Sequence, residues 1–211
     1  MITSARCAGR APESFVSLPP KPEGAEWAAP AKVITRTDYR ADGAGYTEDG
    51  YQQIFVLAAD GGTPRQITWG PYHQGGTIAW SPGGESLIFS ANRHENREWE
   101  PANSEIYEVS LADGEITALT DRHGPDLRPV LSPDATKIAY LGNDERYQGY
   151  DITRLYVMDR DGSNPTLLSG DFDRSVNAHV WKADGTGVYF QYDDEGNTKI
   201  AFMSLDGQVQ D

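Results

Sequence analysis

Serine, histidine and carboxylate side chains are the groups in this sequence that could do chemistry, and the serines are tested first. A hydrolase nucleophile of the α/β type needs the pattern Gly-x-Ser-x-Gly, in which a strained turn between strand and helix exposes the hydroxyl. No serine among the 211 residues lies in this pattern. The nearest serine-bearing segment, Asp161 to Pro165, reads Asp-Gly-Ser-Asn-Pro and is typical of a hairpin turn. We therefore expect no catalytic triad in this chain and no peptide hydrolysis by the chain alone.

The four histidines are candidate metal ligands, because neutral imidazole binds transition metals. His73 and His123 lie 8 and 9 residues before two corresponding serines of a repeat, so both could point to one face of the fold. His94 lies in an expected loop and His179 in an expected strand. The segment from Asp159, Asp-Arg-Asp-Gly, lacks the glycine and glutamate positions of a calcium loop. No carboxylate motif recurs with the histidines, so we expect no metal site and no other cofactor.

The elements that would position such groups belong to a repeat with a period near 50 residues. Each copy contains an apolar strand, a turn of the Ser-Pro type and a second apolar strand. The three copies are Thr77–Ser90, Pro129–Leu141 and Ala178–Gln191. Ser81 and Ser132 are 51 positions apart, and Trp80 and Trp181 are 101 positions apart. This spacing matches the length of a propeller blade.

The second half of each copy is a hairpin that turns at an Asp-Gly pair. The three pairs are Asp60-Gly61, Asp113-Gly114 and Asp161-Gly162. Glycine adopts the positive φ that a tight hairpin needs, and aspartate tolerates the turn. Two hairpins per copy give four antiparallel strands, which is the pattern of a propeller blade. The predicted fold class is therefore all-β, an incomplete β-propeller with about three to four blades of four antiparallel strands.

One turn of the Ser-Pro type breaks the pattern. Alanine stands at position 135, where the other copies have glycine. A left-handed conformation costs a residue with a Cβ atom roughly 1–2 kcal/mol. We therefore expect the turn at Ala135 to adopt a different geometry.

The repeat predicts where the blades begin and end. Residues 33–40 resemble the second strand of a blade, so we expect a partly irregular N-terminal segment, 1–32, followed by blades over 33–211. The expected units are a partial blade 33–68, blades 76–120 and 128–169, and a truncated blade 177–211. Closed propellers need about four to eight blades, so we expect a section of a longer propeller whose open ends favour self-association. A closed four-bladed ring is the alternative, although the first 32 residues contain few strand signals.

Composition restricts the partners of the chain. The net charge is −14, with 32 acidic and 18 basic residues, which disfavours binding to nucleic acid or to an anionic membrane and suits a cationic peptide. Cys7 is the single cysteine, so an internal disulfide and a cysteine-based zinc site are excluded. The N-terminus lacks the apolar stretch of a secretory signal, and no later segment is apolar over the length that spans a membrane. We expect a cytoplasmic protein, or a periplasmic one if a signal peptide is missing from this sequence.

The repeats resemble known propellers. Ala79–Gly84 and Leu131–Ala135, with strands such as Leu155–Asp159, resemble the WD-like repeats of TolB and of the N-terminal propeller in prolyl oligopeptidase family enzymes. Longer stretches resemble the propellers of bacterial acylaminoacyl-peptidase or dipeptidyl-peptidase-like members of that family. These stretches are Tyr39–Tyr46, Asn92–Arg93, Glu98–Pro101, Ser104–Tyr107 and Phe190–Lys199. The resemblance covers roughly residues 17–211.

The resemblance implies the non-catalytic, gating and substrate-selecting propeller of a serine peptidase that acts on short peptides. It also implies a C-terminal α/β-hydrolase domain with a Ser-Asp-His triad outside these residues. Dipeptidyl-peptidase relatives hold the α-ammonium group of the substrate with propeller glutamates, which makes Glu98 and Glu100 candidate substrate contacts. Arg93 in the same segment is a third candidate. The alternative interpretation of this segment is a solvated insertion between two strands.

Two other functions remain open from the sequence. One is a TolB-like propeller that mediates protein interactions in the bacterial envelope. The other is a metal-dependent propeller lyase similar to oligogalacturonate lyases, which would use histidines at the mouth of the channel.

Overall fold

The computed structural model describes residues 1–8, 19–26 and 32–210, and β-strands dominate them. The strands are β1 (Ile2–Ala8), β2 (Arg40–Ala41), β3 (Gly45–Tyr46), β4 (Gly50–Val56), β5 (Arg65–Gln66), β6 (Gln74–Trp80), β7 (Ser86–Ala91), β8 (Glu105–Ser110), β9 (Ile116–Ala118), β10 (Asp126–Leu131), β11 (Lys137–Gly142), β12 (Arg154–Asp159), β13 (Thr166–Leu167), β14 (Val176–Trp181), β15 (Gly187–Asp194), β16 (Asn197–Ser204) and β17 (Val209–Gln210). The helical structure of the described residues is one 3-10 turn, Pro82–Gly84. None of their helices could cross a membrane.

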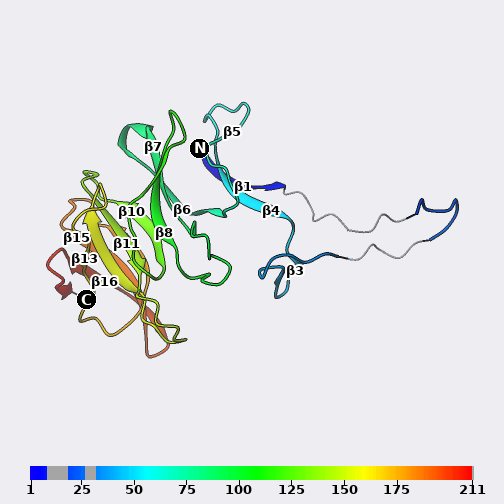
Figure 1. Ribbon diagram of the computed structural model, residues 1–211. Helices are drawn as coiled ribbons and strands as arrows, with labels where there is room; N and C mark the ends of the chain where they lie inside the picture. Colours follow the sequence, from blue (N-terminus) through cyan, green and yellow to red (C-terminus); the bar gives the residue numbers. More distant parts are fainter. Residues whose placement is uncertain (9–18, 27–31, 211) are drawn as a thin grey trace.

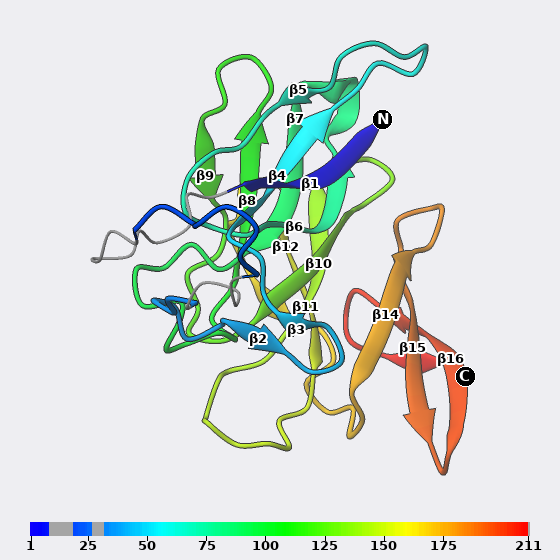
Figure 2. The ribbon, with the colours of Figure 1, turned by 90° about the vertical axis from the view of Figure 1, so that its right-hand side faces the viewer.

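Three of the sheets are four-stranded antiparallel meanders in chain order. They are β6-β7-β8-β9, β10-β11-β12-β13 and β14-β15-β16-β17. Figure 1 shows the sheets following one another from the N-terminal strands β1 and β4 to β15 and β16 near the C-terminus. In Figure 2 the sheet with β14, β15 and β16 stands on the side of the molecule away from β4. The predicted fold class, an all-β section of a propeller with four-stranded blades, is confirmed.

Apolar side chains between neighbouring sheets form the core. Successive residues of a strand point to opposite faces, so each middle sheet contributes to the cores on both of its sides. In β7, Leu87 and Phe89 pack towards the β1-β4-β5 sheet, whereas Ile88 packs towards the β10–β13 sheet. The largest of the three clusters lies between the last two sheets and includes Trp181, whose Nε1 donates a hydrogen bond to the Val130 carbonyl at 2.9 Å. The blades are thus held to one another mainly by buried apolar area.

The first sheet differs from the prediction for residues 33–40. Strand β1, not this segment, pairs with β4, with Ile2 opposite Val56 and Ala8 opposite Gly50. Residues 33–39 form no strand, and residue 40 belongs to the short β2-β3 ribbon. The prediction of a blade strand at 33–40 is therefore wrong. Much of the segment expected to be irregular, at 9–18 and 27–31, lies outside the described residues.

The turn at Ala135 also differs from the prediction. Ala135 has a φ of +57°, close to the values of +74° and +72° at the corresponding Gly84 and Gly185. Its amide donates to the Ser132 carbonyl at 2.8 Å, and the Ser132 hydroxyl accepts from the Lys137 amide at 3.0 Å. These bonds hold the backbone in the left-handed region in spite of the Cβ atom. The expectation of a different turn geometry is wrong.

Replacing Ala135 with glycine is expected to stabilise the protein by about 0.5–1 kcal/mol. Glycine removes the strain of the left-handed conformation, and its greater freedom in the unfolded chain offsets part of the gain. Urea unfolding, followed by the transition midpoint, measures the change. Gly185→Ala is the matched control. Its Cβ would meet only Pro133, at 4.0 Å, so the strain of the left-handed backbone alone should destabilise this variant by roughly 1 kcal/mol. A less stable A135G protein would contradict the strain assigned to this turn.

Candidate functional site

The strand register places two sets of loops at one end of the blades. Gln74 pairs with Ala91, and Ala91 pairs with Glu105, so the start of the first strand, the end of the second and the start of the third lie together. The loops that join second to third strands and fourth to first strands therefore share this end, which we call the loop face. It comprises residues 67–73, 92–104, 119–125, 143–153, 168–175 and 195–196. The Ser-Pro and Asp-Gly turns lie at the opposite end.

The loop that joins β7 to β8, residues 92–104, carries the predicted substrate contacts. The Glu98 side-chain oxygen Oε2 accepts hydrogen bonds from the Thr37 amide at 3.1 Å and from the Thr37 hydroxyl at 3.3 Å. Asn92 Nδ2 donates to the Glu100 carbonyl at 2.7 Å and closes the loop on itself. Trp99, between the two glutamates, has 78 % of its surface exposed. Thr37 and Glu98 thus connect the segment before β2 to the loop face.

A cavity of about 230 Å³ lies between this segment and the loop. Its lining consists of Arg36, Thr37, Asp38, His73, Asn92, Arg97, Glu98 and Pro101. The Arg36 guanidinium is paired with the Asp38 carboxylate through Nε at 2.8 Å and through Nη2. Burial, together with the positive charges of Arg6 and Arg36, lowers the pKa of His73, so this imidazole is neutral at pH 7. The cavity therefore contains both cationic and anionic side chains.

Arg93 and Arg97 lie against a group of tyrosines. The Arg97 guanidinium carbon is 5.0 Å from the ring centre of Tyr72, and the Arg93 carbon is 4.8 Å from the same centre. Arg93 Nη1 also donates to Gln74 Oε1 at 2.6 Å, and burial lowers the pKa of Arg93. Arg97 lines the cavity, whereas the predicted contact Arg93 is not among the lining residues.

The structure brings Glu98 and Glu100 onto one loop but gives their carboxylates different neighbours. Glu100 Oε2 lies 3.4 Å from His123 Nε2, in the loop that precedes the next blade. Glu98 instead contacts Thr37. A shared role of the two glutamates and Arg93 in substrate contact remains a prediction.

The histidines show no arrangement for a metal. His73 and His123 both lie on the loop face, but His73 contacts Gln52 and Arg36 while His123 contacts Glu100. His179 is held between blades by the Ala139 carbonyl at 3.3 Å, and burial lowers its pKa to about 4. Within the described ranges, no three His, Cys, Asp or Glu side chains are grouped so that they could hold a metal ion.

A buried carboxylate lies below the loop face at the start of β8. The Glu105 side chain is 3 % exposed, and Oε2 accepts from the Thr120 hydroxyl at 2.5 Å. His94 Nε2 lies 3.3 Å from the other oxygen. Burial raises the pKa of Glu105 to about 7, and the nearby Asp126 and Asp121 carboxylates add to the shift.

We expect this carboxylate to make stability depend on pH. Glu105 binds its proton more tightly in the folded state, so its contribution is present below about pH 4.5 and is lost as the pH rises through about 7. Glu105→Gln should therefore reduce the fall in unfolding free energy between pH 5 and pH 8, and should stabilise the protein relative to wild type at pH 8. Urea unfolding at the two pH values measures both effects. An unchanged pH slope in E105Q would show that Glu105 is already ionised at pH 5.

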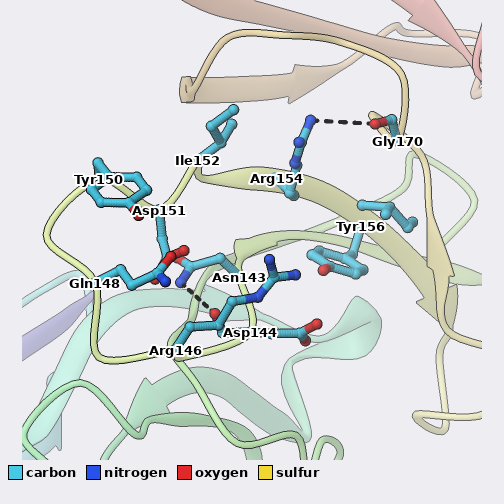
Figure 3. Close-up of a pocket in the computed structure, with 11 residues that line it drawn as sticks. Asn143, Asp144, Arg146, Gln148, Tyr150, Asp151, Ile152, Arg154, Tyr156 and Gly170 are labelled. Carbon is cyan, nitrogen blue, oxygen red and sulfur yellow. Dashed lines mark hydrogen bonds between the residues drawn. The ribbon is translucent and has the colours of Figure 1, made fainter.

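A second cavity, of about 330 Å³, lies on the same face beside the 143–153 loop (Figure 3). Arg154 projects along its rim and donates through Nη1 to the Gly170 carbonyl at 3.4 Å and to the Phe172 carbonyl at 2.5 Å. Tyr150 and Asp151 border the other side, and one Asp151 carboxylate oxygen is buried without a hydrogen-bond partner among the described residues. Arg154 therefore mainly fixes the loop before β14.

The sequence does not predict that Arg36 and Arg97 line the first cavity, nor that Tyr51 and Tyr72 pack against Arg97. These four residues belong to four segments that meet only in the folded chain. Arg97 could have been suspected, because it lies in the same loop as the two glutamates. No sequence signal connects Tyr51 to Arg97, which is 46 positions away.

Comparison with known proteins decides the family. The model of the dipeptidyl peptidase IV (DPP IV) N-terminal region matches residues 26–140, which is more than half of the chain. The chain belongs to the DPP IV N-terminal region family. Dipeptidyl-peptidase 5 of Porphyromonas gingivalis is 26 % identical over 146 residues, which are 68 % of this chain and 21 % of that protein. The chain thus spans about a fifth of the length of that relative.

Solved structures of other proteins share the fold of this chain. A puromycin hydrolase has a TM-score of 0.61 at 20 % identity, over 81 % of this chain and 29 % of that one. A TolB protein from Agrobacterium tumefaciens has a TM-score of 0.58 at 24 % identity, over 76 % of this chain and 56 % of that one. The resemblance to the N-terminal propeller of prolyl oligopeptidase family peptidases, with TolB-like repeats, is confirmed.

Proposed function

We propose that this chain is the gating and substrate-selecting propeller portion of a serine peptidase that acts on short peptides. In the full-length protein an α/β-hydrolase domain would supply the catalytic triad, and the propeller would contribute no catalytic residue. Membership in the DPP IV N-terminal region family supports the proposal. The observation that carries it is the cavity on the loop face, where the Glu98 carboxylate is presented by a closed, polar loop.

The chemistry of Glu98 suits the terminal ammonium group of a peptide. A carboxylate offers about four lone-pair sites, and only some of them are taken by the Thr37 amide and hydroxyl. Hydrogen bonds between a carboxylate and an ammonium group are short and charge-assisted, so they discriminate well against a blocked terminus. The net charge of −14 adds a general attraction for cationic ligands.

Titration calorimetry of the 211-residue chain with a tripeptide amide tests the proposal. The peptide with a free N-terminus should bind at least about tenfold more tightly than its N-acetylated form. Glu98→Gln should remove this preference, while Glu115→Gln, an exposed glutamate at the opposite end of the blade, should retain it. Equal affinity of the wild type for the free and acetylated peptides would overturn the role of Glu98.

We also propose that the chain alone self-associates through the outer face of its last sheet. In the β10–β13 sheet, Leu155 and Val157 are buried by the β14–β17 sheet. The strand register places Ile200 and Phe202 at the corresponding positions of the last sheet, where Ile200 is 72 % exposed. An apolar face that the other repeats cover is a strong site for association.

Ile200→Asp is accordingly expected to shift the chain towards monomer. A charge at the centre of an apolar contact leaves a carboxylate without a partner and weakens association by at least tenfold. Sedimentation velocity across a range of concentrations measures the effect. Tyr147→Asp, an equally exposed position on the loop face, is the control and should behave as the wild type does. A wild-type chain that stays monomeric throughout would contradict the proposal.

A further inference from the structure

Arg93 and Arg97, the two arginines of the 92–104 loop, form no ion pair with a carboxylate among the described residues. Arg36, Arg122, Arg160 and Arg174 each form an ion pair with an aspartate or glutamate. Within residues 1–8, 19–26 and 32–210, neither Arg93 nor Arg97 lies within ion-pair distance of a carboxylate. The chain has 32 acidic residues and only 18 basic ones. Two half-buried guanidinium groups without a counter-charge are therefore a local positive centre in an acidic protein.

The stacking on tyrosine leaves the donors of Arg97 available to a ligand. Its guanidinium carbon lies 5.0 Å from the Tyr72 ring centre and 5.9 Å from the Tyr51 ring centre. The only polar contact of the Arg97 side chain within the described segments is the Tyr51 hydroxyl, at 3.5 Å. A guanidinium held against aromatic rings keeps its N–H groups in one plane, where they match the two oxygens of a carboxylate. Arg97 is thus oriented before any ligand binds.

A second observation points to an anion in the same cavity. The Gln52 amide donates to His73 Nδ1 at 3.2 Å, which leaves the proton of the neutral imidazole on Nε2. His73 Nε2 lies 3.4 Å from Arg36 Nη2, one of whose two protons is donated to Asp38. His73 Nε2 and Arg36 Nη2 are both hydrogen-bond donors and cannot bond to each other. An acceptor oxygen placed within reach of both would stabilise this arrangement. Arg36, His73 and Arg97 all line this cavity.

We propose that the cavity binds a carboxylate group carried by a peptide, with Arg97 as its main partner and Arg36 and His73 as further donors. The inference rests on the proposed function, because Glu98, the next residue after Arg97, is the partner of the peptide ammonium group. The cavity of about 230 Å³ has room for a terminal group and not for a folded domain. The carboxylate comes either from the C-terminus of a very short peptide or from an acidic side chain.

Titration calorimetry of the full chain with three tripeptides, all with a free N-terminus, tests the carboxylate site. The first is neutral with a C-terminal amide, the second has a C-terminal carboxylate, and the third has one glutamate and a C-terminal amide. We expect the second or the third to bind about tenfold more tightly than the first, and the tighter one identifies the source of the carboxylate. Arg97→Gln should remove the difference, whereas Arg174→Gln, which removes an exposed charge from the last blade, should retain it. Equal affinities in the wild type, or a difference that survives in R97Q, would overturn the site.

A measurement on the unaltered chain keeps the test independent of folding in the variant. Sodium acetate should compete with the tightest carboxylate peptide, while sodium chloride of the same ionic strength should not. N-acetylated versions of the peptides separate the two proposals. If the chain prefers peptides with a free N-terminus but does not prefer those with a carboxylate, the anion site is wrong and the proposed function stands. If the acetylated carboxylate peptide binds through Arg97 as tightly as the peptide with a free N-terminus, the anion site stands and the ammonium role of Glu98 is wrong.

Discussion

Replacing Trp181 with alanine is expected to lower the free energy of unfolding by about 3–5 kcal/mol. The indole lies in the cluster between the last two sheets, is 7 % exposed, and joins them through the Val130 carbonyl. Alanine leaves a cavity between two blades and one carbonyl without its donor. The change therefore acts on the contact between blades rather than on one sheet. Urea unfolding followed by circular dichroism measures it.

Trp99→Ala is the control for this substitution. Its ring is 78 % exposed on the 92–104 loop, so its removal should change the unfolding free energy by less than about 0.5 kcal/mol. Equal effects of W181A and W99A would contradict the assignment of the core to the surfaces between blades.

Replacing Arg122 with leucine is expected to cost about 3–5 kcal/mol at pH 8, because it leaves the Asp126 carboxylate buried without its cation. The Asp126 side chain is completely buried and pairs with Arg122, which also lies 4.2 Å above the Tyr156 ring. Burial raises the pKa of Asp126 even with Arg122 present, although the arginine charge opposes the shift. Without the arginine, the pKa of Asp126 in the folded protein rises further. The folded variant therefore binds a proton at Asp126 at a higher pH than the unfolded variant does. Stability lost at pH 8 should therefore be partly regained at pH 5.

The comparison variant for Arg122 is Arg174→Leu. Arg174 pairs with Asp194 near the surface, and exposed pairs of this kind contribute at most about 1 kcal/mol. Unfolding free energies of both variants at pH 5 and pH 8 provide the measurement. A loss in R122L that is as small as in R174L, or that is the same at both pH values, would show that the Asp126 charge is compensated elsewhere.

Much of the fold could be predicted because the strands carry their signals locally. Apolar alternation and the Asp-Gly turns at Gly114 and Gly162 define each hairpin within about 20 residues, and both glycines have positive φ. The pairing of β1 with β4 could not be predicted in this way, since Ile2 and Val56 are separated by the whole N-terminal segment. The left-handed turn at Ala135 could not be predicted from the residue type, because the hydrogen bonds of Ser132 outweigh the intrinsic preference of alanine.

The candidate site could be predicted only in part. Glu98 and Glu100 were found because they stand together in a loop that resembles those of dipeptidyl-peptidase relatives. The role of Arg97 could not be predicted, because its partners Tyr51 and Tyr72 come from other segments. A composition with 32 acidic residues does not indicate that Arg93 and Arg97 form a positive centre on the loop face. Such centres depend on which loops the blade register brings together.

Mapping the peptide contact by nuclear magnetic resonance tests the central claim most directly. The claim is that the loop face binds short peptides with a free N-terminus. On titration of the 15N-labelled chain with a tripeptide, amide shifts should concentrate in residues 68–73, 92–104 and 119–125. Shifts confined to the turns at the opposite end, residues 58–64, 81–85 and 111–115, would contradict the claim, and so would no shifts at millimolar peptide.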